Sequence, residues 1–557
     1  MYSSVDTIWV LLGAVFVFFM QAGFAMVETG FTRAKNAGNI IMKNLMDFAL
    51  GTIVFWLIGF GIMFAGDGSF IGGLDLLVSG DYGVPGSYTS SAYLIFQTVF
   101  CATAATIVSG AMAERTKFIS YCIYSVIISA VIYPISGHWI WGGGWLSQLG
   151  FHDFAGSTAV LLVGGVAAFI GALILGPRIG NYKIDGTPNA IPGHSLTLGA
   201  LGVFILWFCW FGFNGCSTVS ATGDEALISM SSIFITTNLA AATATTSTMI
   251  ITWIRYKKPD VSMTLNGSLA GLVAIPAGCD VVSPVGAFFI GLIASFVVVF
   301  GIEFIDKKLK IDDPVGAIGV HGLCGATGTI LTGLFATKDG LFYGGGAKFL
   351  GVQVLGVVSV IAWVAITMTI VFQVINHTIG LRVTEQEEID GLDSHEHGIT
   401  NSYADFMPMT APVILKNTTV PNIAATQATE AAIETLDKPK KMTKITTIIN
   451  QDKLDLLKAS LDNIGITGIT VTQALGCGMQ KGHKNYYRGV EYDTHLLPKV
   501  KVDIIVCKIP VKLVTDTIQK VLCTGNIGDG KIFVYDVENV IKIRTGEEGY
   551  DALQDNA

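Results

Sequence analysis

Long apolar runs separated by short polar loops occupy roughly the first two thirds of the chain. A helix that crosses the hydrocarbon core of a bilayer needs about 20 mostly apolar residues. Runs that approach this length cover residues 8–27, 46–65, 92–112, 119–136, 158–176, 196–214, 227–253, 262–278, 284–304, 315–335 and 349–376. The pattern therefore predicts eleven membrane-spanning helices.

Lysine and arginine are concentrated in alternate loops between these runs. The first, third, fifth, seventh and ninth loops carry them, whereas the second, fourth, sixth and eighth carry none. Only the tenth loop departs from this pattern, with Lys338 and Lys348. Because positively charged loops stay on the cytoplasmic side, the pattern predicts an outside N-terminus. An odd number of spans then places the C-terminus in the cytoplasm. We expect the chain to lie in the inner, cytoplasmic membrane of the cell.

Two short segments repeat one pattern five spans apart. Residues 153–161 read DFAGSTAVL and residues 313–321 read DPVGAIGVH, so each has an Asp, a Gly three positions later and a Val seven positions later. They open the fifth and tenth runs and would enter the membrane from opposite sides. Such a pair predicts an inverted 5+5 repeat, with a functional site near the midplane between the halves.

The last position of the repeat differs, being Leu161 in the first copy and His321 in the second. An ionisable side chain at membrane depth is costly unless it serves a pathway, so His321 is predicted to line a pore. The alternative is a buried histidine hydrogen-bonded to a neighbouring helix. Asp153 and Asp313 begin their helices, where a carboxylate caps free N–H groups; contact with a ligand is the alternative role.

Composition supports a membrane protein and excludes other classes. Apolar residues make up 51% of the 557 positions, charged residues 14%, and the mean hydropathy is +0.59. A net charge of −8 argues against a nucleic-acid partner. The nine cysteines are scattered singly, without metal-ligand spacing. No nucleophile–base motif or Walker A loop occurs, so the chain is predicted not to be an enzyme.

Several motifs together resemble the ammonium transporter (Amt/Mep/Rh) family. They are FFMQAGFAMVETGFTRAKN at 18–36, GAMAER at 110–115, WGGG at 141–144, DFAGS at 153–157, WFGFN at 210–214 and DDPVGAIGVHG at 312–322. The resemblance covers residues 1 to about 400 and implies a homotrimer with one pore in each subunit. It also implies ammonium or ammonia as the substrate.

The resemblance assigns roles to individual residues. Phe100, Trp141 and Ser217 match an external site that recruits ammonium, with Asp153 as a supporting acid and Asp313 as its symmetry mate. Phe100 and Phe213 match a stacked phenyl gate above an apolar lumen. Aromatic ring faces attract a cation, and an apolar lumen favours the neutral amine over the ion.

One family feature is missing. The family places two facing histidines in the pore; the second is His321 here, but the first position holds Leu161. Leucine can neither accept a hydrogen bond nor carry a proton. Either the pore conducts by a slower or less selective route, or ammonium is bound without efficient passage, which would make the protein an ammonium sensor.

The last part of the chain has a soluble pattern. We expect a transmembrane domain at 1–380, a cytoplasmic C-terminal region at 381–402, a linker at 403–442 and a signalling domain at 443–557. Alternating strands at 443–449, 466–473, 500–506 and 531–537 surround two amphipathic helices. The order βαββαβ predicts an α+β, ferredoxin-like domain.

This domain closely resembles the PII nitrogen-regulatory proteins, through QKGHKNYYRGVEY at 480–492, TGNIGDGKIFV at 524–534 and IKIRTGEEGYDAL at 541–553. The resemblance implies a trimer that binds ATP or ADP, and 2-oxoglutarate through a nucleotide-bound Mg²⁺. The implied nucleotide-site residues are Gly476, Gly478, Gln480, Gly528, Gly530, Lys531, Lys542 and Arg544, with Lys499 meeting 2-oxoglutarate and Gln480 ligating the metal.

The family's mobile effector arm, the T-loop, corresponds to residues 478–497. In soluble relatives this arm can close the cytoplasmic mouth of an ammonium channel through an arginine, here Arg488. Tyr492 occupies the position that some bacteria uridylylate. The chain is therefore predicted to be an ammonium transporter regulated by its own PII domain, or an ammonium receptor that signals to soluble partners of this arm.

Overall fold

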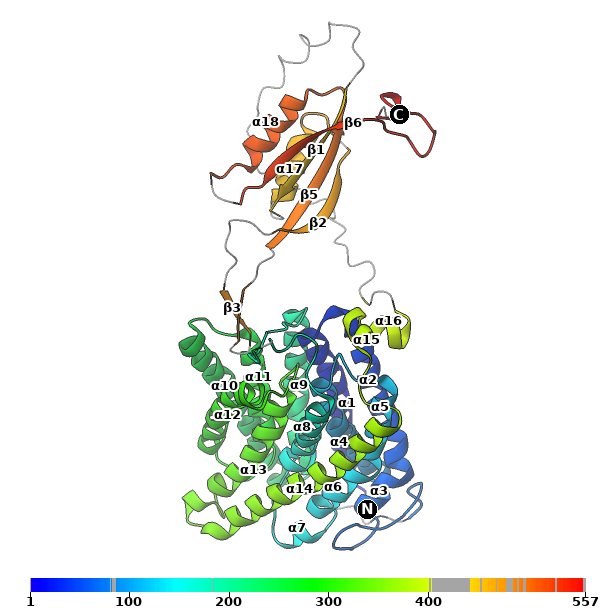
Figure 1. Cartoon of the computed structure of the whole chain (residues 1–557). Coiled ribbons are helices and arrows are strands. Elements are labelled where there is room, and N and C mark those ends of the chain that lie inside the picture. The colour runs from blue at the N-terminus through cyan, green and yellow to red at the C-terminus, as the bar shows by residue number, and fades with distance from the viewer. Residues whose placement is uncertain are drawn as a thin grey trace. The chain divides into compact units, whose positions relative to one another are not determined.

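A computed structural model gives the structure of the chain. It describes residues 2–80, 82, 87–183, 185–399, 402, 441–450, 453–466, 468–476, 484–487, 490–493, 497–525 and 528–553. The contacts divide the chain into two compact units, a helical unit in the N-terminal part and a small sheet-containing unit in the C-terminal part. Both units are drawn in Figure 1.

The helical unit is a bundle of long apolar helices. Within the described residues, ten helical segments have the length and hydropathy of a membrane span. They are Ser4–Phe31, Ala34–Phe64, Ser90–Ala111, Phe118–Gln148, Ser157–Leu175, Leu196–Thr218, Asp224–Tyr256, Pro284–Leu309, Ile318–Phe335 and Ala347–Thr378. The run predicted at 262–278 forms helix α11, Val261–Ala274, which is apolar but only 14 residues long.

These segments contain the helices labelled in Figure 1. Their bounds are α1 Ser4–Phe31, α2 Ala37–Val54, α3 Phe60–Phe64, α4 Ser90–Ala111, α5 Phe118–Ile127, α6 Tyr133–Trp141, α7 Trp145–Gln148, α8 Val163–Leu175, α9 Leu196–Gly215, α10 Asp224–Tyr256, α12 Pro284–Phe304, α13 Cys324–Phe335 and α14 Ala347–Thr378. Two short helices follow, α15 Glu385–Asp390 and α16 Leu392–His397. The N-terminus and α7 lie at one end of the bundle, and α15 and α16 lie at the other (Figure 1).

Glycines allow the helices of the bundle to approach closely. A Cβ atom at Gly165 of α8 would lie 2.2 Å from the backbone nitrogen of Gly322, and one at Gly30 of α1 would lie 2.4 Å from that of Gly199 in α9. No side chain fits at these distances. In a membrane, where helix association depends on close packing rather than on the hydrophobic effect, such contacts hold the bundle together.

The two repeated segments have the same local structure. Each begins with a glycine at positive φ, Gly156 at 115° and Gly316 at 81°, and continues as a short π-helix, Ser157–Leu162 or Ile318–Leu323, before α8 or α13. Short π-helical turns are frequently found at functional sites. The repeat seen in the sequence therefore corresponds to two matching, irregular helix starts.

The C-terminal unit is a four-stranded antiparallel sheet with two helices. Its elements are β1 Met442–Ile449, α17 Leu454–Asp462, β2 Thr470–Gly476, β5 Leu497–Val506, α18 Val511–Leu522 and β6 Lys531–Val537. The strand order is β2-β5-β1-β6, and β3 Lys484–Tyr487 pairs separately with β4 Val490–Asp493. The four-stranded sheet and its two helices confirm the ferredoxin-like arrangement predicted for this domain.

The core of this unit lies between the sheet and its two helices. Leu457 and Leu461 of α17 are fully buried, as are Val514 and Ile518 of α18. They pack against alternate residues of β1 and β5, because successive side chains of a strand point to opposite faces. The apolar faces of the two predicted amphipathic helices are therefore the buried faces.

Candidate functional site

Three aromatic side chains from separate helices meet in the helical unit. The ring of Phe100, on α4, stacks on that of Phe213, on α9, with centroids 4.5 Å apart and an interplanar angle of 28°. Trp141, at the end of α6, meets Phe100 edge to face at 6.1 Å. Phe100 and Phe213 are fully buried, whereas Trp141 is half-buried. The stacked pair therefore forms an apolar plug with an accessible indole beside it.

Polar groups next to these rings are held by backbone bonds. The Ser217 hydroxyl donates to the carbonyl of Phe213 at 2.7 Å, and the indole N–H of Trp141 donates to the carbonyl of Asp153 at 2.7 Å. Since its proton is engaged, the Ser217 oxygen keeps its lone pairs for a donor. The arrangement suits a small cation with N–H groups, which would meet ring faces and a hydroxyl acceptor.

Both predicted aspartates cap the irregular helix starts. The carboxylate of Asp153 accepts backbone N–H bonds from four residues, Gly156 to Ala159, at 2.7–3.0 Å. Asp313 accepts three such bonds, from Gly316 to Ile318, at 2.8–3.1 Å. Capping, the role expected from their positions, is what the structure shows. A carboxylate that satisfies several N–H groups also fixes the start of the π-helix that follows.

The two last positions of the repeats are both buried. Leu161 is fully buried, and its backbone N–H donates to the carbonyl of Gly156 at 3.0 Å. His321 is 4% exposed, and its ring lies 5.8 Å from that of Phe24. His321 lines a small cavity together with Phe24, Glu28 and Asn266. Its contact with this cavity is an observation, and the pore-lining role remains a prediction.

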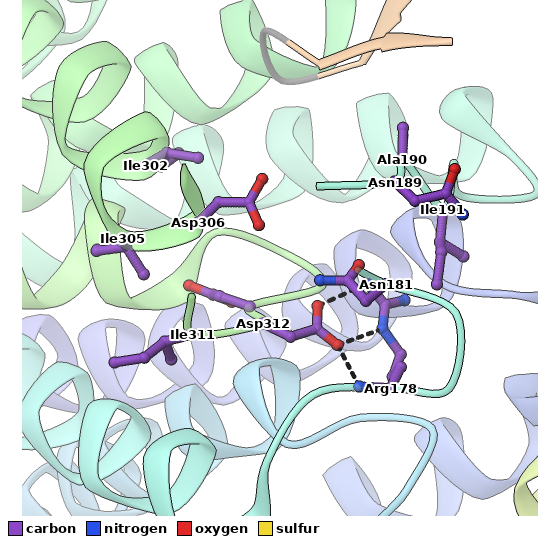
Figure 2. A pocket seen from close by; sticks show the side chains of 11 residues that line it. Arg178, Asn181, Asn189, Ala190, Ile191, Ile302, Ile305, Asp306, Ile311 and Asp312 are labelled. Atoms are coloured by element: carbon purple, nitrogen blue, oxygen red, sulfur yellow. Dashed lines mark hydrogen bonds and ion pairs between the residues drawn. The ribbon is translucent and has the colours of Figure 1, made fainter. Parts of the chain in front are cut away.

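A buried network of charges lies in the loops outside the spans. The guanidinium of Arg178 donates to both oxygens of Asp312 at 2.8–2.9 Å and to Glu114 at 2.8 Å. Arg33 also pairs with Glu114. The carboxylate of Asp312 and the side chains of Asn181 and Asp306 face a cavity of about 40 Å³ (Figure 2).

These arginines control the protonation of the buried carboxylates. Burial acts to raise the pKa of Asp312, but the positive charges of Arg178 and Arg115 outweigh it and hold this pKa well below its ordinary value. For Glu114 burial acts in the same direction, and Arg178 and Arg33 again lower the pKa overall. Both carboxylates are therefore ionised at neutral pH.

Comparison with known proteins identifies the helical unit. The model of the Ammonium Transporter Family matches residues 8–402, and that of Nitrogen regulatory protein P-II matches residues 442–547. The chain belongs to the ammonium transporter family. It carries in addition a PII nitrogen-regulatory domain.

Individual relatives cover the family-matched part of the chain. Ammonium transporter Amt2 of Archaeoglobus fulgidus is 46% identical over 427 residues, which are 72% of this chain and 89% of the relative. A putative ammonium transporter of Synechocystis is 41% identical and covers 71% of this chain and 89% of its own length. These relatives are named as transporters and not as enzymes. Membership of such a family supports the prediction that the chain is not an enzyme.

Solved structures share the fold. A structure described as a sensor Amt protein is 40% identical, with a TM-score of 0.66, and the match covers 71% of this chain and 98% of that one. Mep2 of Candida albicans is 27% identical, with a TM-score of 0.65 and coverage of 75% and 95%. The fold is therefore shared with Mep2 and with a protein described as a sensor.

In this family member the C-terminal region contacts the loops of the bundle. Arg382 pairs with Glu388 at 2.7 Å, and Asp393, on α16, accepts the backbone N–H groups of Gly38 and Asn39 at 3.0 and 2.8 Å. Lys35 donates to backbone carbonyls at the end of α15. Residues 382–393 thus hold the start of α2 through charged hydrogen bonds.

The PII domain brings together only part of its predicted nucleotide site. Lys499 donates to the carbonyl of Gly528 at 3.3 Å and to Asn450. Gly528 and Gly530 have φ of 119° and 113°, and a Cβ at Gly530 would lie 2.0 Å from the carbonyl oxygen of Ile448. A cation beside a glycine turn fits an anionic phosphate group.

The other predicted residues of this domain are partly described by the structure. Gly476 ends β2 opposite β5, and Lys531 begins β6. Lys542 pairs with Glu547 at 3.6 Å, in the segment that also holds Arg544. Gly478, Gln480 and Arg488 lie outside the described residues, as does the side chain of Tyr492. Among the described residues, no group of three His, Cys, Asp or Glu could hold a metal ion.

Two sets of residues were not singled out from the sequence. The Arg178–Asp312–Glu114 network joins three loops that are far apart in the chain, so no local pattern indicates it. Glu28 and Asn266 at the His321 cavity carry a signal, because an acid and an amide stand in apolar runs. Weighing every polar residue at membrane depth, rather than the repeats alone, would have found them.

Proposed function

We propose that the chain transports ammonium nitrogen across the cytoplasmic membrane and that its fused PII domain regulates this transport. The observation that carries the proposal is the stacked pair Phe100–Phe213, with Trp141 and the Ser217 oxygen beside it. An accessible cation site above an apolar plug binds the ion on one side and favours passage of the neutral amine. Relatives named as ammonium transporters support the substrate.

The proposal includes the architecture expected from the sequence. It takes α11 as an additional span beside the ten long segments, which gives eleven, and relates the two halves as an inverted repeat. The matching π-helical starts at Ser157 and Ile318 support this relation. The N-terminus lies outside, the PII domain in the cytoplasm, and three chains form a trimer with one pore each.

The PII domain senses nucleotide and 2-oxoglutarate in this proposal. Lys499 and the Gly528–Gly530 turn hold phosphate and carboxylate groups, and Gln480 ligates the nucleotide-bound Mg²⁺. The T-loop, with Arg488 and Tyr492, is the effector arm that acts on the pore or on a soluble partner. A covalent link raises the effective concentration of this arm to the order of millimolar, so its action hardly depends on expression level.

A second function is favoured by Leu161. This residue removes the hydrogen-bonding capacity of one pore position, and a structure 40% identical to the chain is described as a sensor Amt protein. In this alternative, ammonium bound near Phe100 and Trp141 shifts the C-terminal region and the PII domain toward a signalling state. Transport is then slow or absent.

Charge movement in proteoliposomes distinguishes the two functions. The full chain is compared with a version truncated near residue 403 and with full-length Lys499→Ala, each with and without ATP and 2-oxoglutarate. A sustained current that scales with ammonium, and that the ligands change only when Lys499 and the PII domain are present, supports a regulated transporter. A small transient in all versions, with ammonium still bound, supports the sensor. No ammonium response and no ammonium binding would contradict both.

A further inference from the structure

A buried carboxylate lies near the pore histidine without a family role assigned to it. Glu28, near the end of α1, is 3% exposed. Its Oε2 atom accepts hydrogen bonds from Ser109 at 2.7 Å and Asn44 at 3.2 Å. Among the residues that the structure describes, no side chain or backbone group donates to the other oxygen, Oε1. Half of the hydrogen-bonding capacity of this carboxylate is therefore unused by the protein.

The nearest buried cation does not take up this capacity. Lys43, on α2, is 1% exposed and donates to the backbone carbonyl of Ser109 at 3.3 Å. Its ammonium group also lies 5.2 Å from the ring centroid of Tyr121. Lys43 and Glu28 thus bind different groups of Ser109: Lys43 contacts the backbone carbonyl, and Glu28 contacts the hydroxyl. The lysine balances the charge of Glu28 without a direct ion pair.

Glu28 instead lines the cavity that contains His321. The cavity has a volume of about 20 Å³, and its polar lining consists of Glu28, Asn266 and His321. A cavity of about 10–15 Å³ on this measure is enough for one water-sized molecule. The remaining lining residues are Phe24, Val27, Ile107, Leu269, Val315, Ala317 and Val320. The cavity thus has room for one small polar guest within apolar walls.

The other two polar residues also have polar atoms without a protein partner. Asn266 is fully buried and His321 is 4% exposed. In the described part of the chain, neither the oxygen nor the nitrogen of the Asn266 amide has a hydrogen-bond partner, and neither does Nδ1 of His321. Buried polar atoms without partners cost free energy. Three such side chains around one cavity indicate a ligand that satisfies them.

The chemistry of the three side chains specifies the ligand. A carboxylate oxygen, an amide oxygen and an imidazole nitrogen in its acceptor tautomer form a set of hydrogen-bond acceptors. They match a guest with several N–H donors and a positive charge. We propose that Glu28, Asn266 and His321 form an inner binding site for one ammonium ion. Glu28 supplies a negative charge to the lumen of a chain in which Leu161 replaces a histidine.

This inference rests on the proposed function, because it requires that ammonium reaches the lumen. The competing explanation is that Glu28 only anchors α1 to Asn44 and Ser109. Glu28→Gln separates the two explanations, since glutamine has nearly the same shape and keeps an acceptor for these bonds but loses the charge. Glu28→Asp keeps the charge and shortens the side chain. Asp47→Asn is the matched control, because Asp47 is buried on α2 and accepts a bond from Tyr121 without lining the cavity.

The experiment measures ammonium binding and charge movement with the full-length protein. Ammonium chloride is titrated calorimetrically into the protein in lipid nanodiscs, with sodium chloride as the reference, and the same variants are tested in proteoliposomes. Because a charged hydrogen-bond partner is lost, we expect Glu28→Gln to weaken inner-site binding about tenfold or more. The ammonium concentration for half-maximal charge movement should rise accordingly. Glu28→Asp should lose less ammonium affinity than Glu28→Gln. Asp47→Asn should match the wild type in both ammonium affinity and charge movement.

Two results would overturn the inference while leaving the proposed function intact. One is a wild-type response to ammonium that Glu28→Gln leaves unchanged in affinity and in charge movement. The other is an equal loss in Glu28→Gln and Asp47→Asn with lowered thermal stability in both, which would show a structural role. A wild-type protein that neither binds ammonium nor moves charge would instead refute the proposed function, and the inner site with it.

Discussion

The buried ion pair between Arg178 and Asp312 allows a quantitative prediction. Both side chains are at most 4% exposed, and three hydrogen bonds of 2.8–2.9 Å join Arg178, including its backbone N–H, to the Asp312 carboxylate. Asp312→Asn keeps the shape but removes one of the negative charges that face the buried guanidinium of Arg178. Removing one partner of a buried pair costs about 3–5 kcal/mol. At ~2 °C per kcal/mol for a large domain, the melting temperature should fall by roughly 6–10 °C.

The assay is thermal unfolding of the purified full-length protein in one detergent, followed by tryptophan fluorescence. Asp306→Asn is the control, since Asp306 faces the same cavity (Figure 2) and accepts a bond from Tyr182 at 3.0 Å. Because asparagine keeps an acceptor for this bond, Asp306→Asn should cost at most about 1 kcal/mol. The double variant Arg178→Gln, Asp312→Asn should be less destabilised than the two single variants added together. Equal shifts in Asp312→Asn and Asp306→Asn would refute the reasoning.

The same pair predicts how stability depends on pH. Although burial alone would raise it, the pKa of Asp312 lies well below its ordinary value because Arg178 and Arg115 are close. A carboxylate whose pKa is lowered on folding stabilises the protein above its unfolded pKa, about 3.9. That stabilisation is lost as the pH falls below this value. The difference in the free energy of unfolding between wild type and Asp312→Asn should thus be constant from about pH 5 to 8. It should shrink in more acidic solution.

Three further predictions concern the pore and the PII domain. Leu161→His should raise ammonium flux in proteoliposomes; an unchanged flux in a folded variant would mean that this position is not limiting. Phe213→Ala removes one ring of the stacked pair and should increase passage of larger amines relative to ammonium, with Phe211→Ala as a control. Equal selectivity in both variants would argue against a gate. Gly530→Ala places a Cβ about 2.0 Å from the carbonyl oxygen of Ile448 and should weaken ATP binding in calorimetry, whereas Gly468→Ala, in open space, should not.

The sequence was sufficient for the features that depend on local composition. Apolar runs of sufficient length predicted the positions of the long spans, and the amphipathic pattern predicted that α17 buries one face. The capping roles of Asp153 and Asp313 also followed from position, since a carboxylate before a helix start meets free N–H groups. The eighth run, 262–278, was harder, because α11 is only 14 residues long and ends before the predicted boundary.

The C-terminal domain likewise has features that the sequence predicted and features that only its tertiary structure decided. Alternating strands and two amphipathic helices predicted its fold correctly, and the strand order followed from the ferredoxin-like arrangement. The contact of Lys499 with Gly528 was not predictable from spacing, because the two residues lie on separate segments that only the sheet brings together. For this reason the residue types of a nucleotide site were visible in the sequence, whereas its geometry was not.

What the sequence determined by itself is the class of the molecule: a helical membrane unit of the ammonium transporter type, joined to a PII-like domain. Its motifs also indicated the aromatic residues and the substitution at Leu161. The tertiary structure alone decided which polar groups share a cavity. Glu28, Asn266 and His321 come from three segments separated by up to 293 positions. The fold brings them together around one cavity and leaves polar atoms of each without a protein partner, and this is the physical reason that a site among them cannot be read from any one stretch of the chain.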